Sequence, residues 1–126
     1  KDFDEAILLN RENAYAYFHR ADAHKKLGQY ERAIKDFDKV IELNPENVAG
    51  HVNRGNAYSA LGEHKRAIQD YDRAVELDPD YVLGFYNRGL AYSELKQHQR
   101  AIRDFDKVVE LSPQDTSAYY NRGMWA

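Results

Sequence analysis

Apolar residues recur at three- and four-residue spacing along most of the chain. Tyr17, Ala21, His24 and Leu27 fall on one such stripe, and polar residues fill most of the positions between stripes. This spacing is typical of amphipathic helices that pack one face against their neighbours. It predicts helices over Ala14–Leu27, Tyr30–Leu43, Val48–Leu61, His64–Leu77, Val82–Leu95 and His98–Leu111.

Helix-breaking residues separate these segments. Gly28 follows the first predicted helix, and Asn44-Pro45 follows the second, because the residue before a proline is disfavoured in a helix. The connections are two to four residues long, so successive helices must lie antiparallel.

The whole pattern repeats every 34 residues. Val48 to Tyr81 aligns with Ala14 to Asn47 before it and with Val82 to Asp115 after it. All three prolines fall in one column of this alignment, and the seven glycines fall in three columns with none left over. Such a period is typical of a solenoid, in which each unit buries its apolar face against its neighbours. We therefore predict an all-α solenoid of antiparallel helix pairs, with three full repeats plus a half repeat at each end.

The repeat boundaries divide the chain into 1–13 (second helix of a partial repeat), 14–47, 48–81, 82–115 and 116–126 (first helix of a partial repeat). We interpret the chain as part of a longer array. The partial repeats leave Phe3, Ile7, Tyr119 and Trp125 as apolar surface at the two ends. Truncation explains this surface, and end-to-end association of chains is the alternative.

Composition disfavours several classes of partner. With 18 basic and 21 acidic residues and a net charge of −3, the chain has no basic surplus to attract phosphate backbones, so nucleic acid is not expected. No apolar run approaches the roughly 20 residues of a membrane span, so we expect no membrane insertion. The lack of cysteine removes disulfides and thiolate metal sites without identifying a compartment.

Motifs for catalysis and metal binding are absent from the sequence. No glycine-rich phosphate loop, nucleophile elbow or His-Glu-x-x-His sequence occurs. His24, His51, His64 and His98 stand in columns that hold tyrosine or another aromatic residue in other repeats, which indicates packing roles. His19 and His24 are five residues apart, not the four that would place two metal ligands on one helix face. We therefore expect no enzyme activity, no metal site and no cofactor.

These columns resemble the tetratricopeptide repeat (TPR) over essentially the whole chain. The family pattern has an aromatic, Leu-Gly and Tyr in the first helix, then Ala, Phe and Ala in the second, then Pro. The matching columns are Tyr17, His51, Phe85 and Tyr119; Ala21, Gly55, Gly89 and Gly123; His24, Tyr58 and Tyr92; Ala33, Ala67 and Ala101; Phe37, Tyr71 and Phe105; Val40, Ala74 and Val108; and Pro45, Pro79 and Pro113. The resemblance implies a right-handed superhelix whose first helices line a concave groove and whose second helices face outward.

The resemblance further implies that this groove binds a peptide segment of a partner protein. Asn53, Asn87 and Asn121 recur there at the repeat period, and an asparagine can both donate to and accept from a peptide backbone. The arrangement is similar to the asparagine ladder of the O-linked N-acetylglucosamine transferase superhelix; alternatively, the asparagines only cap or solvate the helix surface. The expected groove residues are Phe18, Val52, Asn53, Asn56, Leu83, Tyr86, Asn87, Leu90, Tyr120 and Asn121.

One ligand class of the family is disfavoured. TPR co-chaperones that hold the acidic C-terminus of heat-shock chaperones use a carboxylate clamp of Lys, Asn, Asn, Lys and Arg. The corresponding positions here are Phe18, Asp22, Asn53, Leu83 and Asn87, so every cation is missing. A C-terminal carboxylate is therefore not the expected ligand.

One column departs from the family pattern. Arginine stands at four positions where the family usually has leucine, and a guanidinium on a packing face needs a partner. The second helices supply an aspartate column at the right period. We hypothesise the pairs Arg20–Asp36, Arg54–Asp70 and Arg88–Asp104, with Arg122 as the fourth member of the arginine column.

Three functions remain open. The first is a non-enzymatic interaction module whose groove binds a segment of a partner protein. The second is a structural module that forms an end-to-end homo-oligomer. The third is an accessory domain that recruits substrate to a larger enzyme. The sequence favours the first, because the expected groove is neutral, rich in asparagine and lined by aromatic and aliphatic residues.

Overall fold

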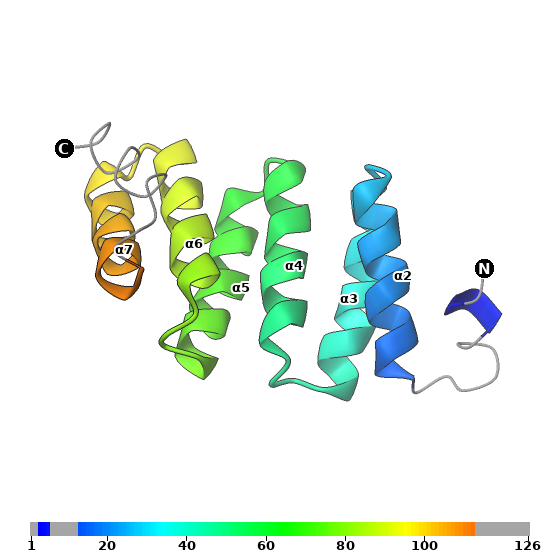
Figure 1. Ribbon diagram of the computed structural model, residues 1–126. Coiled ribbons are helices and arrows are strands. Elements are labelled where there is room, and N and C mark those ends of the chain that lie inside the picture. Colours follow the sequence, from blue (N-terminus) through cyan, green and yellow to red (C-terminus); the bar gives the residue numbers. More distant parts are fainter. Residues whose placement is uncertain (1–2, 6–12, 113–126) are drawn as a thin grey trace.

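The computed structural model describes residues 3–5 and 13–112, and within them all regular structure is helical (Figure 1). The helices are α2 (Ala14–Lys26), α3 (Tyr30–Leu43), α4 (Val48–Ala60), α5 (His64–Leu77), α6 (Val82–Glu94) and α7 (His98–Leu111). The predicted helices are confirmed, with one difference. The first helix of each pair ends one residue early, because Leu27, Leu61 and Leu95 are the C-cap residues.

Side chains from the connections begin two of the helices. Asn13 Oδ1 accepts a hydrogen bond from the Ala16 amide at 3.0 Å, at the start of α2. Asn47 Oδ1 accepts one from the Gly50 amide at 2.8 Å, at the start of α4. Each bond satisfies an amide that has no partner within the helix.

The turns between the helices of a pair need a left-handed residue. Gly28 has φ +78° and Gly62 has φ +79°, which glycine adopts without a steric penalty. Lys96 occupies the same turn in the third pair with φ 62°. A residue with a Cβ in this conformation costs about 1–2 kcal/mol.

The helices stand side by side in chain order, each packed against the next (Figure 1). The first helices of successive pairs also contact one another, α2 with α4 and α4 with α6, whereas contacts among α3, α5 and α7 are at most marginal. The closer spacing of α2, α4 and α6 makes them the inner layer of the stack. We call the surface that these three helices present the inner face.

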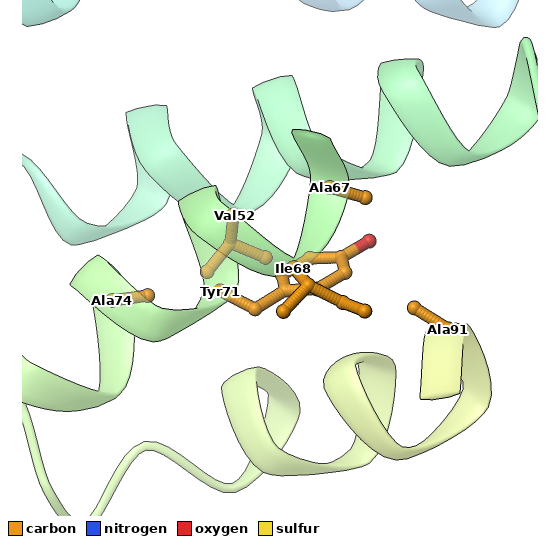
Figure 2. Packing of buried hydrophobic residues seen from close by; sticks show 6 residues of the cluster. All are labelled: Val52, Ala67, Ile68, Tyr71, Ala74 and Ala91. Atoms are coloured by element: carbon orange, nitrogen blue, oxygen red, sulfur yellow. The ribbon is translucent and has the colours of Figure 1, made fainter. Parts of the chain in front are cut away.

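The core consists of small residues packed around one large ring per repeat. In the second repeat Tyr71 is 1 % exposed and lies among aliphatic side chains of α4, α5 and α6 (Figure 2). Gly55 on α4 makes this possible, because a Cβ at that position would lie 2.8 Å from Tyr71 Cε1. Gly89 faces Phe105 in the same way, at 2.7 Å. The small-residue column therefore sets how closely the two helices of a pair approach.

The hypothesised arginine–aspartate pairs are confirmed. Arg54 Nε and Nη2 donate to the two oxygens of Asp70 at 3.0 and 2.6 Å, and Arg20–Asp36 and Arg88–Asp104 are bonded in the same bidentate way. The aspartates are buried in all three repeats. The hydrogen bonds to Asp104 raise the pKa of Arg88, and burial raises the pKa of Asp104 despite the nearby guanidinium.

Each of these arginines also reaches a second aspartate, which the sequence analysis did not foresee. Arg54 Nη1 donates to Asp38 of the preceding repeat at 2.8 Å, and the equivalent pairs are Arg20–Asp4 at 3.0 Å and Arg88–Asp72 at 2.9 Å. Each guanidinium thus joins two successive second helices. We call each arginine together with its two aspartates an arginine bridge. The three bridges fix neighbouring repeats relative to one another.

No helix in the described ranges combines the length and the apolar character needed to cross a membrane.

Candidate functional site

Three exposed apolar side chains lie on helices of the inner face. Tyr15 on α2 is 68 % exposed, and Leu83 and Leu90 on α6 are 53 % and 36 % exposed. Among the described residues, the other large apolar side chain with comparable exposure is Leu27, at the turn after α2. Tyr15 and Leu83 occupy the same position in their repeats. Because exposed apolar surface is a common feature of interaction sites, we consider the inner face the candidate binding face.

Phe18, Val52 and Tyr86 were expected in the groove and occupy the same position in their repeats, but their surroundings differ. Phe18 and Tyr86 are half-buried, and their rings lie against the core rings of Phe37 at 5.7 Å and Phe105 at 6.0 Å. Val52 is only 3 % exposed and belongs to the core cluster (Figure 2). The expectation that Val52 lines the groove is therefore wrong. Its short branched side chain ends within the core, whereas the longer aromatic rings extend to the surface.

The asparagines expected in the groove differ from one another. Asn53 Nδ2 donates to the Ala49 carbonyl at 2.9 Å, and its Oδ1 accepts from Lys25 Nζ at 2.7 Å. The half-buried Asn87 has no side-chain hydrogen bond within the described part of the chain. The position of Lys25 is held by Ser59 one repeat later, which explains why Asn87 has no lysine contact. Two equivalent asparagines thus offer different groups to a ligand.

Asn56 is partly committed to the core. Its Oδ1 accepts a hydrogen bond from the Tyr71 hydroxyl at 2.5 Å. Burial raises the pKa of Tyr71 to about 12, so the phenol stays protonated at neutral pH and remains a donor. Asn56 can therefore present its two amide donors to a ligand, whereas its oxygen keeps only one lone pair for a further hydrogen bond.

A cleft lies between the N-terminal parts of α2 and α4. Its volume is about 350 Å³, and it is lined by Ala14, Tyr15, Phe18, His19, Asn47 and Ala49. The His19 ring stacks on Phe3 at 5.5 Å and lies 4.2 Å from the Tyr15 ring. The cleft therefore has a wall of packed aromatic rings on the α2 side.

Family comparisons agree with this architecture. Residues 14–47 and 82–115 match a model described as the tetratricopeptide repeat, residues 37–69 match a second model of the same description, and residues 55–96 match a TPR repeat model. The first of these models alone covers more than half of the chain. The protein belongs to the tetratricopeptide repeat family.

Solved TPR structures are similar in fold. The first TPR of Spaghetti (RPAP3), bound to the HSP90 peptide SRMEEVD, is 28% identical with a TM-score of 0.86 over 89% of each chain. The second TPR domain of human RPAP3, in complex with the HSP70 peptide SGPTIEEVD, is 29% identical with a TM-score of 0.85, covering 89% of this chain and 93% of that one. YrrB, a TPR protein with an unusual peptide-binding site, is 28% identical with a TM-score of 0.88, covering 99% of this chain and 64% of that one. No curated protein sequence matches the chain.

The histidines of this TPR array are engaged in packing and turns. His51 is 6 % exposed and its Nε2 lies 2.9 Å from the Pro45 carbonyl, and His24 Nδ1 lies 2.7 Å from Gln29 Oε1. No group of three or more His, Cys, Asp or Glu residues suited to a metal ion occurs in the described ranges.

Some of the predicted positions fall outside the described residues. Tyr120 and Asn121 of the expected groove lie there, as do Ile7, Tyr119 and Trp125 of the expected apolar ends. Conversely, Lys25 was not among the predicted groove residues, although its ammonium contacts Asn53 of the next TPR. The signal was weak, because Lys25 and Lys26 form an adjacent pair on a helix that already carries polar residues.

Proposed function

We propose that the chain is a non-enzymatic interaction module that binds an extended segment of a partner protein along the inner face. The observation that carries this proposal is the exposure of Tyr15, Leu83 and Leu90 on that face. Neighbouring side chains there offer amide donors and acceptors, which suits the backbone of a peptide in an extended conformation. Apolar anchors supply the affinity and the amides fix the path of the chain.

Two of the similar structures support a peptide ligand, since the RPAP3 domains are described with bound HSP90 and HSP70 peptides. Their specific ligands do not carry over to this chain. The positions that the family resemblance assigns to a carboxylate clamp hold Phe18, Asp22, Asn53, Leu83 and Asn87. We therefore propose an internal peptide segment, not a free C-terminus, as the ligand.

The test compares exposed leucines on and off the inner face. Peptides are first selected from a displayed random library against the full chain, and their affinities are measured by fluorescence anisotropy. Leu83→Ser with Leu90→Ser should weaken binding about tenfold or more, because a ligand would bury the exposed part of two leucines. Leu27→Ser is the matched control, since Leu27 is 73 % exposed but lies at the α2–α3 turn, and it should leave the affinity unchanged.

Each of these leucines is already exposed, so the variants should fold like the original chain. Circular dichroism of all variants checks this and excludes loss of fold as the cause of weaker binding. Equal loss of affinity in the Leu27→Ser variant, or full affinity in the double variant, would contradict binding on the inner face.

A further inference from the structure

Lys25 is a cation on the inner face that has no acidic partner among the described residues. Its Nζ crosses from the last turn of α2 to α4, where it donates to Asn53 Oδ1 at 2.7 Å. The nearby carboxylate of Asp22 is bound instead by Lys26 at 3.1 Å. Among the described residues, no carboxylate lies within ion-pair distance of Lys25.

The hydrogen bond to Asn53 does not fully replace the hydration that the Lys25 ammonium loses by burial. Burial lowers the pKa of Lys25, with the negative charge of Asp22 acting in the opposite direction. An ammonium has three donors, and the one amide oxygen it contacts carries no net charge. A ligand carboxylate would offset the lost hydration more fully than this oxygen does.

Lys25 binds a residue that lies one helical turn beyond a residue of the aromatic-walled cleft. Ala49 lines the cleft, and Asn53, which holds the ammonium, follows it four residues later on α4. Four residues of α-helix rise about 6 Å. In an extended peptide, residues i and i+2 point to the same side and lie about 6.6 Å apart. One peptide side chain can thus occupy the cleft while the next one on the same side reaches Lys25.

We propose that this end of the inner face selects an extended peptide with an apolar side chain for the cleft and an Asp or Glu two residues away for Lys25. The inference rests on the proposed function and specifies the ligand at that surface. The incoming carboxylate replaces Asn53 Oδ1 on the ammonium, and the released amide oxygen then accepts a backbone N–H of the same peptide. Charge recognition and backbone recognition are thereby coupled through one hydrogen bond.

The next repeat provides an internal comparison. Ser59 stands at the position of Lys25, so Asn87 receives no lysine from the equivalent position. The acidic preference is accordingly confined to the α2–α4 junction. Because the remaining inner face carries apolar side chains, a peptide should still bind there when the lysine charge is removed.

The experiment is a selection from a phage-displayed random peptide library on the full chain and on its Lys25→Met variant. With the original chain, the selected peptides should share an apolar residue and an acidic residue separated by one position. With Lys25→Met, the apolar residue should persist and the acidic preference should disappear. Lys25→Arg serves as a charge-preserving control and should retain the acidic preference.

A double-mutant cycle then isolates the contact. Replacing the selected Glu by Gln in one labelled peptide should weaken its binding to the original chain about tenfold, as expected for a charge-assisted hydrogen bond. The same replacement should change binding to Lys25→Met by less than twofold.

The outcomes separate this inference from the proposed function. Peptides that lose affinity in the Leu83→Ser/Leu90→Ser variant but show no acidic preference, or an unchanged Glu-to-Gln effect in Lys25→Met, would overturn the inference alone. Failure to select any peptide that depends on the inner face would overturn both.

Discussion

Removal of one arginine bridge should destabilise the array far more than removal of an ordinary surface arginine. Arg54 is the best choice, because it lies in the central pair and makes three hydrogen bonds, two to Asp70 and one to Asp38. We consider Arg54→Leu, since leucine is the residue usual at this position in the family. The substitution leaves the Asp70 carboxylate buried without its guanidinium.

The expected cost follows from exposure. The Asp70 side chain is 5 % exposed and that of Arg54 is 21 % exposed. Loss of one partner of a buried ion pair costs about 3–5 kcal/mol. The lower limit, about 3 kcal/mol, applies here because the arginine side of the pair is partly solvated. The contact with Asp38 adds little, since that carboxylate is 51 % exposed.

The double variant Arg54→Leu/Asp70→Leu tests the reasoning directly. Replacing both partners removes the stranded charge, so we expect the double variant to recover at least about 2 kcal/mol relative to Arg54→Leu. Arg73→Leu is the matched control. Arg73 pairs with Glu76 at 2.7 Å but is 46 % exposed, and its loss should cost about 0.5 kcal/mol.

The assay is urea unfolding followed by far-UV circular dichroism, with hydrogen exchange to report whether α4 and α5 open together. A stability of Arg54→Leu within 1 kcal/mol of the original chain would refute the account. So would a double variant whose destabilisation equals the sum of those of Arg54→Leu and the single variant Asp70→Leu, because the two residues would then act independently.

Three further substitutions test local features of the fold. Lys96→Gly should raise the free energy of unfolding by about 1 kcal/mol, because glycine adopts the left-handed turn without a steric penalty. Gly89→Ala should lower it by about 1–3 kcal/mol, since the added Cβ would lie 2.7 Å from Phe105 Cε1. Asn47→Ala should lower it by about 1 kcal/mol through loss of the cap on the Gly50 amide. Urea unfolding measures all three.

Each of these substitutions has a control in the chain. Gly62→Lys, at the same turn position as Lys96, should destabilise by about as much as Lys96→Gly stabilises. Ala21 already occupies the position of Gly89 in the first repeat and is fully buried there, so Ala21→Gly should not gain stability. An unchanged midpoint for Lys96→Gly, a neutral Gly89→Ala, or an Asn47→Ala as stable as the original chain would each contradict its stated cause.

Much of the fold could be predicted because the same 34-residue pattern occurs three times in the sequence. The helix spans followed from periodicity, and the columns of Gly28 and Pro45 marked the ends. The arginine–aspartate pairs within repeats also followed, because a charged residue in a packing column requires a partner. The contacts between repeats were missed. Asp38 and its equivalents recur at the same period, but their exposure made them resemble ordinary solvated residues.

The site was less predictable than the fold. The repeat alignment placed Val52 in the groove because it occupies the same repeat position as Phe18 and Tyr86. Its shorter side chain ends within the core. The Asn53 side chain is engaged by Lys25, a long and flexible residue of another repeat, and backbone periodicity does not indicate how far such a side chain reaches. Repeat alignment predicts backbone positions well, but the surface depends on the size and length of each side chain.

Amide chemical-shift mapping of a selected peptide on the isotope-labelled chain tests the central claim most directly. The account predicts that the largest perturbations fall on α2, α4 and α6, around Tyr15, Asn53, Leu83 and Leu90, while the outer surfaces of α3, α5 and α7 change little. Perturbations concentrated on α3, α5 and α7 would contradict peptide binding on the inner face.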